Sequence, residues 1–224
     1  MTRSFILFAA TLCMALAAAY PTTAEDTPHR ERIEWCDIWF TDADKTDRPR
    51  VLLVGDSITR GYFGDVEKRL GDAAYCGRWT SSRSVGDPVF FQELALVLGQ
   101  YDYDVIHFNH GLHGWDYGEE EYRAGFARML AELQEHAPEA TLLCGLTTPV
   151  RDDSGMAEHA GRVAPRNDIA RELCDKAGIA TTDLHALAVE NPEHIGGDGV
   201  HFSGPGRVAQ AKLVAEAIAS VLDE

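Results

Sequence analysis

The stretch "VLLVGDSITRGYFG", residues 51–64, leads from four apolar residues directly into a glycine, an acid and a serine. A short apolar run bounded by turn residues is typical of a strand in a parallel sheet that is covered on both faces. Such sheets bind their ligands beyond the carboxyl ends of the strands, where the loops converge. Gly55 permits a tight turn, and a helix from Ile58 onward would direct its N-terminal amides to that edge. The stretch therefore predicts an α/β fold with Ser57 at the rim of the sheet.

Three further apolar runs of strand length follow along the chain, at "DVIHFN" (104–109), "TLLCGL" (141–146) and "IATTDL" (179–184). Helical patterns lie between the runs. Residues 119–136 have acids in their first turn and a proline two residues beyond their end, and one apolar stripe at helical spacing: Tyr122, Phe126, Met129, Leu130 and Leu133. A last helix begins after Ser203, with Pro205 near its first position. This alternation predicts a three-layer α/β/α sandwich with a flavodoxin-like parallel sheet.

The length of 224 residues, 45% of them hydrophobic, is enough for one sizeable core. We expect a single domain over residues 50–224. Residues 25–49 are polar but carry Trp35 and Trp39, and we interpret them as an N-terminal extension packed on the domain.

The first residues have the pattern of a secretory signal peptide. Arg3 is followed by an apolar run over residues 5–19 and then by small residues ahead of a charged segment. The alternative is a membrane anchor, but the run is shorter than the roughly 20 residues that span a bilayer. We therefore expect residues 1–24 to be removed, no stable membrane insertion afterwards, and a secreted or periplasmic protein.

The formal net charge of −16 argues against a partner with a phosphate backbone, so we expect no nucleic-acid binding. It favours a neutral or cationic small substrate or a polysaccharide, although a solvated acidic surface explains the charge equally well.

Four cysteines follow residue 24, an even number for an oxidising compartment. Cys36 and Cys76 lie in polar segments and are the favoured disulfide pair, whereas Cys144 is expected to be a buried thiol.

Taken alone, "GDS" is an ordinary turn and helix-cap sequence. A partner for Ser57 stands near the C-terminus in "GGDGVHFSGPG" (196–206), where Asp198 and His201 are three residues apart. A short Asp-x-x-His turn sets the carboxylate beside one ring nitrogen while the other faces outward, which makes the imidazole a base. The alternative is a solvated turn with a helix cap. Both motifs fall at predicted loops, which favours a Ser-His-Asp triad.

"VGDSIT" together with "DGVHFS" resembles the first and last signature blocks of the SGNH hydrolases, also called GDSL esterases and lipases, and the resemblance spans the chain from Val51 to the last helix. It implies that Ser57 is the nucleophile, that Asp198 and His201 supply acid and base, and that the fold is an α/β/α sandwich. The family completes an oxyanion hole with the serine's own amide, a glycine and an asparagine. The glycine block fits "SRSVGDP" (82–88), which would make Gly86 the second donor.

The third block departs from the family's Gly-x-Asn-Asp. In an ungapped register Gly111-Leu112-His113-Gly114 takes its place, and His113 stands where the asparagine is expected. Asn109, four residues earlier, is the alternative. Either side chain donates a hydrogen bond to an oxyanion. The sequence favours Asn109, because a neutral amide is always a donor whereas His113 needs the right tautomer or a proton.

His107, His110 and His113 suggest a metal site at first glance. On a strand, however, His110 points away from the other two, so we expect neither a metal nor a cofactor. Trp115 follows the third block and offers an aromatic face for a sugar ring, and Arg83 lies beside the second block where an acidic sugar would meet it. Ordinary packing and surface charge explain these two residues as well.

The signal-peptide pattern and the resemblance together predict a secreted serine esterase, most simply one that removes acetyl groups from a carbohydrate or polysaccharide. One alternative is a lipase, lysophospholipase or thioesterase acting on longer acyl chains. Another is a non-catalytic carbohydrate-binding protein of the same fold. The sequence leaves the polysaccharide, the acyl position and the oligomeric state open.

Overall fold

The computed structural model describes residues 28–222, and the expected signal peptide, residues 1–24, lies outside the described residues. Six strands form one sheet in the order β1-β3-β2-β4-β5-β6. Their bounds are β1 Cys36–Phe40, β2 Arg50–Gly55, β3 Tyr75–Ser81, β4 Val105–Phe108, β5 Thr141–Gly145 and β6 Ala180–Thr182. Neighbours from β3 to β6 are parallel, and β1 pairs antiparallel with β3 at the edge.

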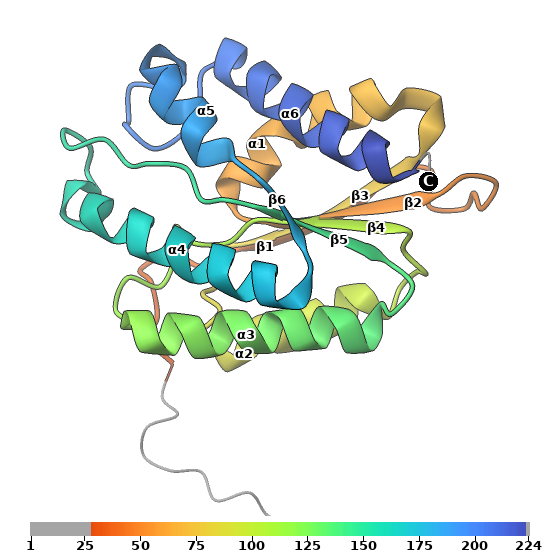
Figure 1. The fold of residues 1–224 in the computed structure, drawn as a ribbon, viewed down its shortest axis with the longest axis horizontal. Helices are drawn as coiled ribbons and strands as arrows, with labels where there is room; N and C mark the ends of the chain where they lie inside the picture. Colours follow the sequence, from red (N-terminus) through yellow and green to blue (C-terminus); the bar gives the residue numbers. More distant parts are fainter. Residues whose placement is uncertain (1–27, 223–224) are drawn as a thin grey trace, which may run out of the picture.

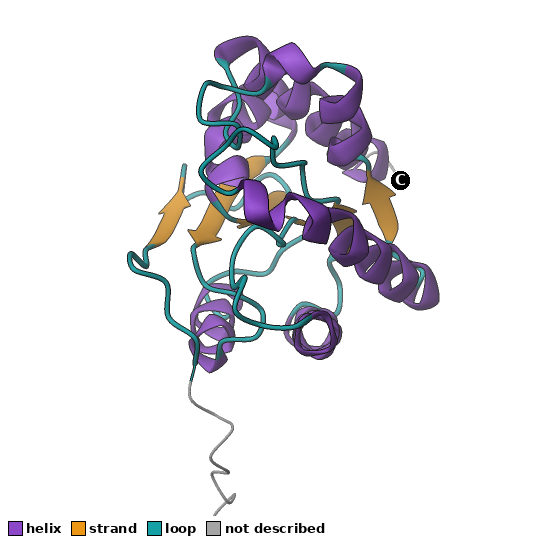
Figure 2. Ribbon diagram, turned by 90° about the vertical axis from the view of Figure 1, so that its left-hand side faces the viewer, coloured by secondary structure: helices purple, strands orange, loops and turns teal. Residues whose placement is uncertain are grey.

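Helices cover both faces of this sheet (Figures 1 and 2). One layer contains α1 Ser57–Leu70, α5 Leu184–Glu190 and α6 Gly204–Leu222, and the other contains α2 Pro88–Leu98, α3 Glu119–His136 and α4 Ala160–Ala177. Three short 3₁₀ turns, Gly71–Ala73, Ala157–His159 and Pro192–His194, complete the described elements. The three-layer α/β/α sandwich predicted from the sequence is confirmed.

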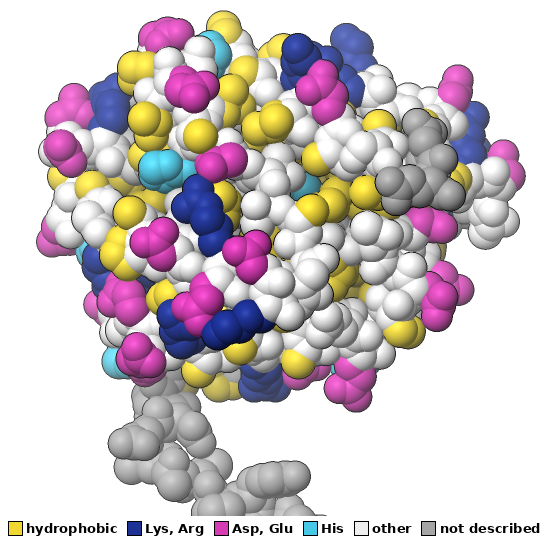
Figure 3. Space-filling model, in the orientation of Figure 1, with side chains coloured by type: hydrophobic (Ala, Val, Ile, Leu, Met, Phe, Trp, Pro, Cys, Tyr) yellow, Lys and Arg dark blue, Asp and Glu magenta, His cyan; other side chains and the backbone are white. Residues whose placement is uncertain are grey.

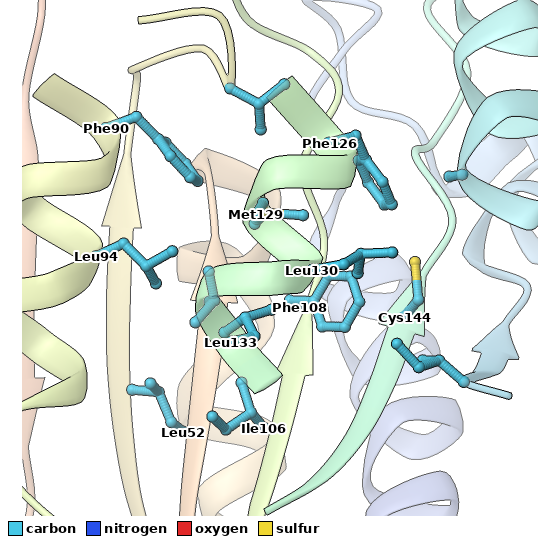
Figure 4. Close-up of a cluster of buried hydrophobic side chains, with 14 of the residues drawn as sticks. Leu52, Phe90, Leu94, Ile106, Phe108, Phe126, Met129, Leu130, Leu133 and Cys144 are labelled. Atoms are coloured by element: carbon cyan, nitrogen blue, oxygen red, sulfur yellow. The ribbon is translucent and has the colours of Figure 1, made fainter. Parts of the chain in front are cut away.

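The alternation of side chains along β2 explains why the strand is apolar throughout. Leu52 and Val54 point into the cluster formed with α2 and α3, whereas Val51 and Leu53 point into the cluster formed with α1 and α6. Figure 4 shows the first cluster, in which Leu52 lies among side chains from both helices. A strand buried on both faces needs apolar residues at every position, and each such side chain contributes roughly 1.5–3 kcal/mol to folding.

The apolar runs at 51–54, 104–109, 141–146 and 179–184 correspond to β2, β4, β5 and β6, and α3 has the bounds that the apolar stripe predicts. The sequence analysis missed β3, whose sequence "YCGRWTS" lacks an apolar run. A Cβ on Gly77 of β3 would overlap the ring of Phe40, so glycine there lets β1 lie close. The segment interpreted as an extension thus contributes an edge strand to the sheet.

The sequence allows a disulfide without requiring one, and the Cys36–Cys76 pair that it favours is wrong. Cys36 lies opposite Ser81 at one end of β3, while Cys76 lies five residues away along the same strand, and both are free thiols. Cys144 is a buried thiol, as expected.

Asp and Glu side chains are spread over the face seen in Figure 3, with smaller groups of Lys and Arg among them. Within residues 28–222, no helix is both long enough and apolar enough to cross a membrane.

Candidate active site

Ser57 is the first residue of α1 and follows β2 by two positions. β3, which follows β2 in the chain, lies on one side of β2 in the sheet, and β4 lies on its other side. The order in which strands are added to the sheet therefore reverses between β2 and β4. Loops at such a reversal diverge and leave a crevice at the carboxyl edge of the sheet. The hydroxyl is half-buried there, beside amides of the first helical turn that have no intrahelical acceptor.

Gly55 and Asp56 fix the start of α1. A Cβ on Gly55 would overlap the Thr59 hydroxyl and come within 2.9 Å of the Asn109 carbonyl oxygen, so glycine is required for close packing. Asp56 caps the helix, because its Oδ1 accepts a hydrogen bond of 2.9 Å from the Ile58 amide. Asp56 is fully buried, and burial raises the pKa of its carboxyl group.

Ser57, His201 and Asp198 form one hydrogen-bonded series. Ser57 Oγ lies 2.8 Å from His201 Nε2, and His201 Nδ1 lies 2.7 Å from Asp198 Oδ2. An imidazole can withdraw a proton from a serine when a carboxylate lies beside one of its ring nitrogens and the serine hydroxyl lies beside the other.

A short turn before α6 holds Asp198 and His201 in this geometry. Asp198 Oδ1 accepts from the amides of Val200 and His201 at 3.0 and 2.9 Å. Gly199 has φ of +74°, a left-handed conformation that favours glycine. Partial burial opposes ionisation of Asp198, but these amides and the His201 ring outweigh it and lower its pKa to about 2. The carboxylate is therefore charged throughout the neutral range.

A second histidine, His113, lines the same pocket as Ser57 and His201. Its Nδ1 lies 3.0 Å from Oε2 of Glu31, whose Oε1 also accepts from the Gly114 amide at 3.1 Å. Burial disfavours the charged ring, but the Glu31 hydrogen bond and the charges of Asp56 and Glu31 outweigh burial and raise the pKa of His113. His113 thus sits in the site as a ring biased toward the protonated form, in which both nitrogens donate.

Arg166 of α4 holds the loop that carries His113. Its Nη1 donates to the carbonyl oxygens of Gly111 and His113, and its Nη2 donates to that of Gly114, all at 2.9 Å. The side chain is fully buried, and burial lowers its pKa to about 10, which still leaves it charged at neutral pH. A charged fork with three carbonyl partners gives the loop one fixed position.

The other two oxyanion candidates lie elsewhere. Asn109 is buried, and its amide donates to the Gly145 carbonyl oxygen at 2.9 Å, across to β5. The Gly86 amide donates to Ser84 Oγ at 3.1 Å, and Gly86 lines a different pocket from Ser57. A Cβ on Gly86 would come within 2.7 Å of the Tyr117 ring, so its lack of a side chain serves packing. The structure brings His113, and not Asn109 or Gly86, to the pocket around Ser57.

Trp115 lines the pocket and Arg83 does not. The Trp115 ring stacks on His159 with centroids 4.7 Å apart and an interplanar angle of 5°. Arg83 is engaged by the carboxylates of Glu34, Asp87 and Glu93, and its side chain is only 18% exposed. Its position corrects the expectation that it meets a sugar, because its ion pairs fasten the N-terminal segment to the domain.

His107 and His110 are both fully buried. Burial lowers the pKa of His107 to about 4, and it is the largest of the causes that lower the pKa of His110 to about 3. They are therefore neutral parts of the core. Over residues 28–222, no group of three or more His, Cys, Asp or Glu side chains is arranged to hold a metal ion.

Two pockets open beside Ser57. The large pocket has a volume of about 680 Å³ and lies between the N-terminal segment, the His113 loop and residues 155–159. The small pocket has a volume of about 250 Å³ and lies between the first turns of α1 and α6.

Glu31 and Arg166 were missed by the sequence analysis, because residues 82 and 53 positions away from His113 give no local pattern.

The sequence pattern of the GDSL-like Lipase/Acylhydrolase family matches residues 53–208. An acetylxylan esterase from Xylanibacter ruminicola is 24% identical over 222 aligned residues, which cover 79% of this chain and 44% of that protein. The chain thus spans less than half the length of this curated relative.

Two solved structures resemble this one in fold. A carbohydrate acetylesterase from Sinorhizobium meliloti superposes with a TM-score of 0.64 at 16% identity, covering 78% of this chain and 100% of that one. A lipase/acylhydrolase from Enterococcus faecalis superposes with a TM-score of 0.63, also at 16% identity, covering 77% and 96% of the two chains.

Proposed function

The chain belongs to the GDSL-like lipase/acylhydrolase family, and from this premise we propose that it is a secreted serine esterase that removes acetyl groups from a carbohydrate. The observation that carries the proposal is the hydrogen-bonded series from Ser57 through His201 to Asp198, with contacts of 2.8 and 2.7 Å. The names of the acetylxylan esterase and the carbohydrate acetylesterase support the acetyl group and the sugar.

In the proposed reaction Ser57 Oγ attacks the ester carbonyl carbon, and its proton passes to His201 Nε2. The same proton then goes to the sugar oxygen as the carbon–oxygen bond breaks, which leaves an acetylated serine. A water molecule then gives one proton to His201 as its oxygen attacks the acetyl carbon, and His201 returns that proton to Ser57 Oγ as the bond to the acetyl group breaks and acetate leaves. Asp198 stays ionised, keeps the ring in the right tautomer and stabilises the transient imidazolium.

We assign the oxyanion to two donors, the Ser57 amide at the start of α1 and the protonated ring of His113. Glu31 accepts from Nδ1, so Nε2 carries the second ring proton and is free to donate. This assignment replaces Asn109 and Gly86, whose donor groups are occupied by Gly145 and Ser84. A cationic donor in a partly enclosed site stabilises developing negative charge more strongly than a neutral amide does.

The large pocket is the proposed site for the sugar. Trp115 lies at the pocket wall, where His159 stacks on its ring and the Arg166 guanidinium lies 4.2 Å from the ring centroid, and Arg30, Glu31 and Glu158 provide polar groups around the pocket. Charged and polar side chains, Arg32 and Asp116 among them, make up most of the residues that line it, which suits a hydroxylated ring better than a long acyl chain.

The test is acetate release from acetylated xylan, with p-nitrophenyl acetate and p-nitrophenyl octanoate measured in parallel. We expect release from the polymer, a preference for the acetyl ester, and a loss of at least about 10⁵-fold in kcat in Ser57→Ala. Faster octanoyl hydrolysis would move the assignment to a lipase or thioesterase. Xylan binding without turnover of any ester would make the protein a binding module.

A further inference from the structure

We propose that the small pocket beside Ser57 is a subsite for a carboxylate, and that the acetylated substrate therefore carries a sugar acid next to the ester. The inference rests on the proposed function and specifies its substrate. The residues that would bind the carboxylate are Arg60 of α1 with Arg207 and Gln210 of α6.

The pocket is contiguous with the reacting groups. Ser57 and His201 themselves form part of its lining, and Ile58, Phe202 and the backbone of Gly61 form the rest. Arg207 lies beside Gly61, since a Cβ built on Gly61 would be in van der Waals contact with Cδ of Arg207 at 3.4 Å. A group bound in a pocket of about 250 Å³ at this point is within a sugar ring's length of the ester.

Both arginines lack a carboxylate partner within the part of the chain that the structure describes. Others on this acidic surface are paired, as Arg83 is with Glu93 at 3.0 Å and Arg162 with Glu119 at 2.7 Å. Arg60 instead lies over the Trp35 ring, with Cζ 4.3 Å from the centroid. Stacking of this kind holds a guanidinium in place and leaves its N–H groups available to a ligand.

Gln210 supplies an independent indication of a ligand. The residue is 1% exposed and lines the pocket, yet neither its Nε2 nor its Oε1 has a hydrogen-bond partner among the described residues. A buried amide without hydrogen-bond partners is destabilising, because it has given up its bonds to water and gained none in return. A carboxylate would accept from Nε2 and the guanidinium groups together, and an adjacent sugar hydroxyl would donate to Oε1.

The overall charge argues against a substrate that carries many carboxylates. A protein with a net charge of −16 repels a polyanion at long range, so a chain of uronic acids is a poor match. A single hexuronic acid branch on a neutral acetylated polysaccharide needs only one local pair of cations. The class we infer is therefore a neutral acetylated sugar chain with isolated hexuronic acid substituents.

The experiment compares two acetylated xylo-oligosaccharides that differ only in a hexuronic acid branch beside the acetylated sugar. We expect kcat/KM to be roughly three- to tenfold higher for the acidic one at low ionic strength and the ratio to fall as NaCl is added. Arg207→Gln and Arg60→Gln should bring the ratio toward one. Arg69→Gln, which removes the same charge from the far end of α1, is the matched control and should keep it.

Binding separates this inference from the esterase proposal. In Ser57→Ala, which cannot turn over, calorimetry should show the acidic oligosaccharide binding roughly three- to tenfold more tightly than the neutral one, with the difference lost on adding Arg207→Gln. Equal binding of both oligosaccharides, or loss of the preference in Arg69→Gln as well, would overturn the carboxylate subsite even if the enzyme hydrolyses acetyl esters. Preferential binding without hydrolysis of any ester would overturn the esterase and leave the subsite standing.

Discussion

Removing the charge of Glu31 should disable the oxyanion site without touching the Ser57–His201–Asp198 series. In Glu31→Gln the amide oxygen still accepts from His113 Nδ1, so the ring keeps its position. Because the carboxylate at 3.0 Å no longer favours the protonated ring, the pKa of His113 falls, and above that lowered pKa the ring is neutral with its proton on Nδ1. Nε2 then presents a lone pair to the oxyanion instead of a hydrogen.

The magnitude follows from the value of one oxyanion donor. Losing such a donor costs about 10²–10³ in kcat, or roughly 2.7–4 kcal/mol of transition-state stabilisation, and we expect that loss at any pH where the native ring is protonated and the variant ring is not. The pKa of His113 is raised above its ordinary 6.5 in the native protein, so wild-type activity should fall only as pH rises through that raised pKa. In Glu31→Gln this alkaline fall should begin at lower pH. Activity should partly recover in acid, where the ring is protonated again.

The assay is the pH dependence of kcat for p-nitrophenyl acetate between pH 5 and 9. Glu34→Gln is the matched control, because Glu34 belongs to the same N-terminal segment but pairs with Arg30 and Arg83. His113→Asn provides a donor that does not titrate, and in that background Glu31→Gln should have no further effect on the profile. A Glu31→Gln profile equal to wild type, or an equal shift in Glu34→Gln, would refute the role of the Glu31 charge.

Three further outcomes are expected. Asp198→Asn should lower kcat about 10³–10⁴-fold at every pH from 5 to 9, because the pKa of Asp198 is about 2 and the native carboxylate does not titrate in that range; a loss confined to one end of the range would contradict this. Gly55→Ala should lower the free energy of unfolding in urea denaturation by about 1–3 kcal/mol, because the added Cβ would overlap Thr59. Gly64→Ala in α1 is the control: its Cβ meets no atom within 4 Å, so the substitution should leave the free energy of unfolding unchanged or raise it. Arg166→Leu should lower the free energy of unfolding by about 2–4 kcal/mol by leaving three loop carbonyls without their donor, and an unchanged melting temperature would show that the loop needs no such clamp.

The parallel sheet could be predicted from sequence because each of its central strands is apolar on both faces, as β2 shows with Val51 to Val54. The edge pair could not be predicted in the same way. β3 contains Gly77 and Arg78, and it lies between β2 and β1. On the β1 side, Phe40 fills the space over the glycine and Asp37 pairs with Arg78 at 2.9 Å. Pairing between distant segments leaves no periodic signal in either of them.

The sequence also indicated Ser57, Asp198 and His201, since each belongs to a short motif whose residues are near neighbours in the chain. It pointed to Asn109 and Gly86 for the oxyanion site, and here local patterns were insufficient. Whether an amide is available depends on what else accepts from it, and Gly145 and Ser84 accept from these two.

The sequence by itself thus determined the layer order of the central fold and the three residues proposed for the chemistry, because burial periodicity and short motifs are local properties. Only the tertiary structure decided that Glu31 approaches His113 and that Arg166 fixes the loop that carries His113. It also placed Arg60 and Arg207 in one pocket with Ser57, without carboxylate partners among residues 28–222. Those contacts join residues tens of positions apart. They depend on packing of the whole domain, which brings charges together that no stretch of sequence places side by side.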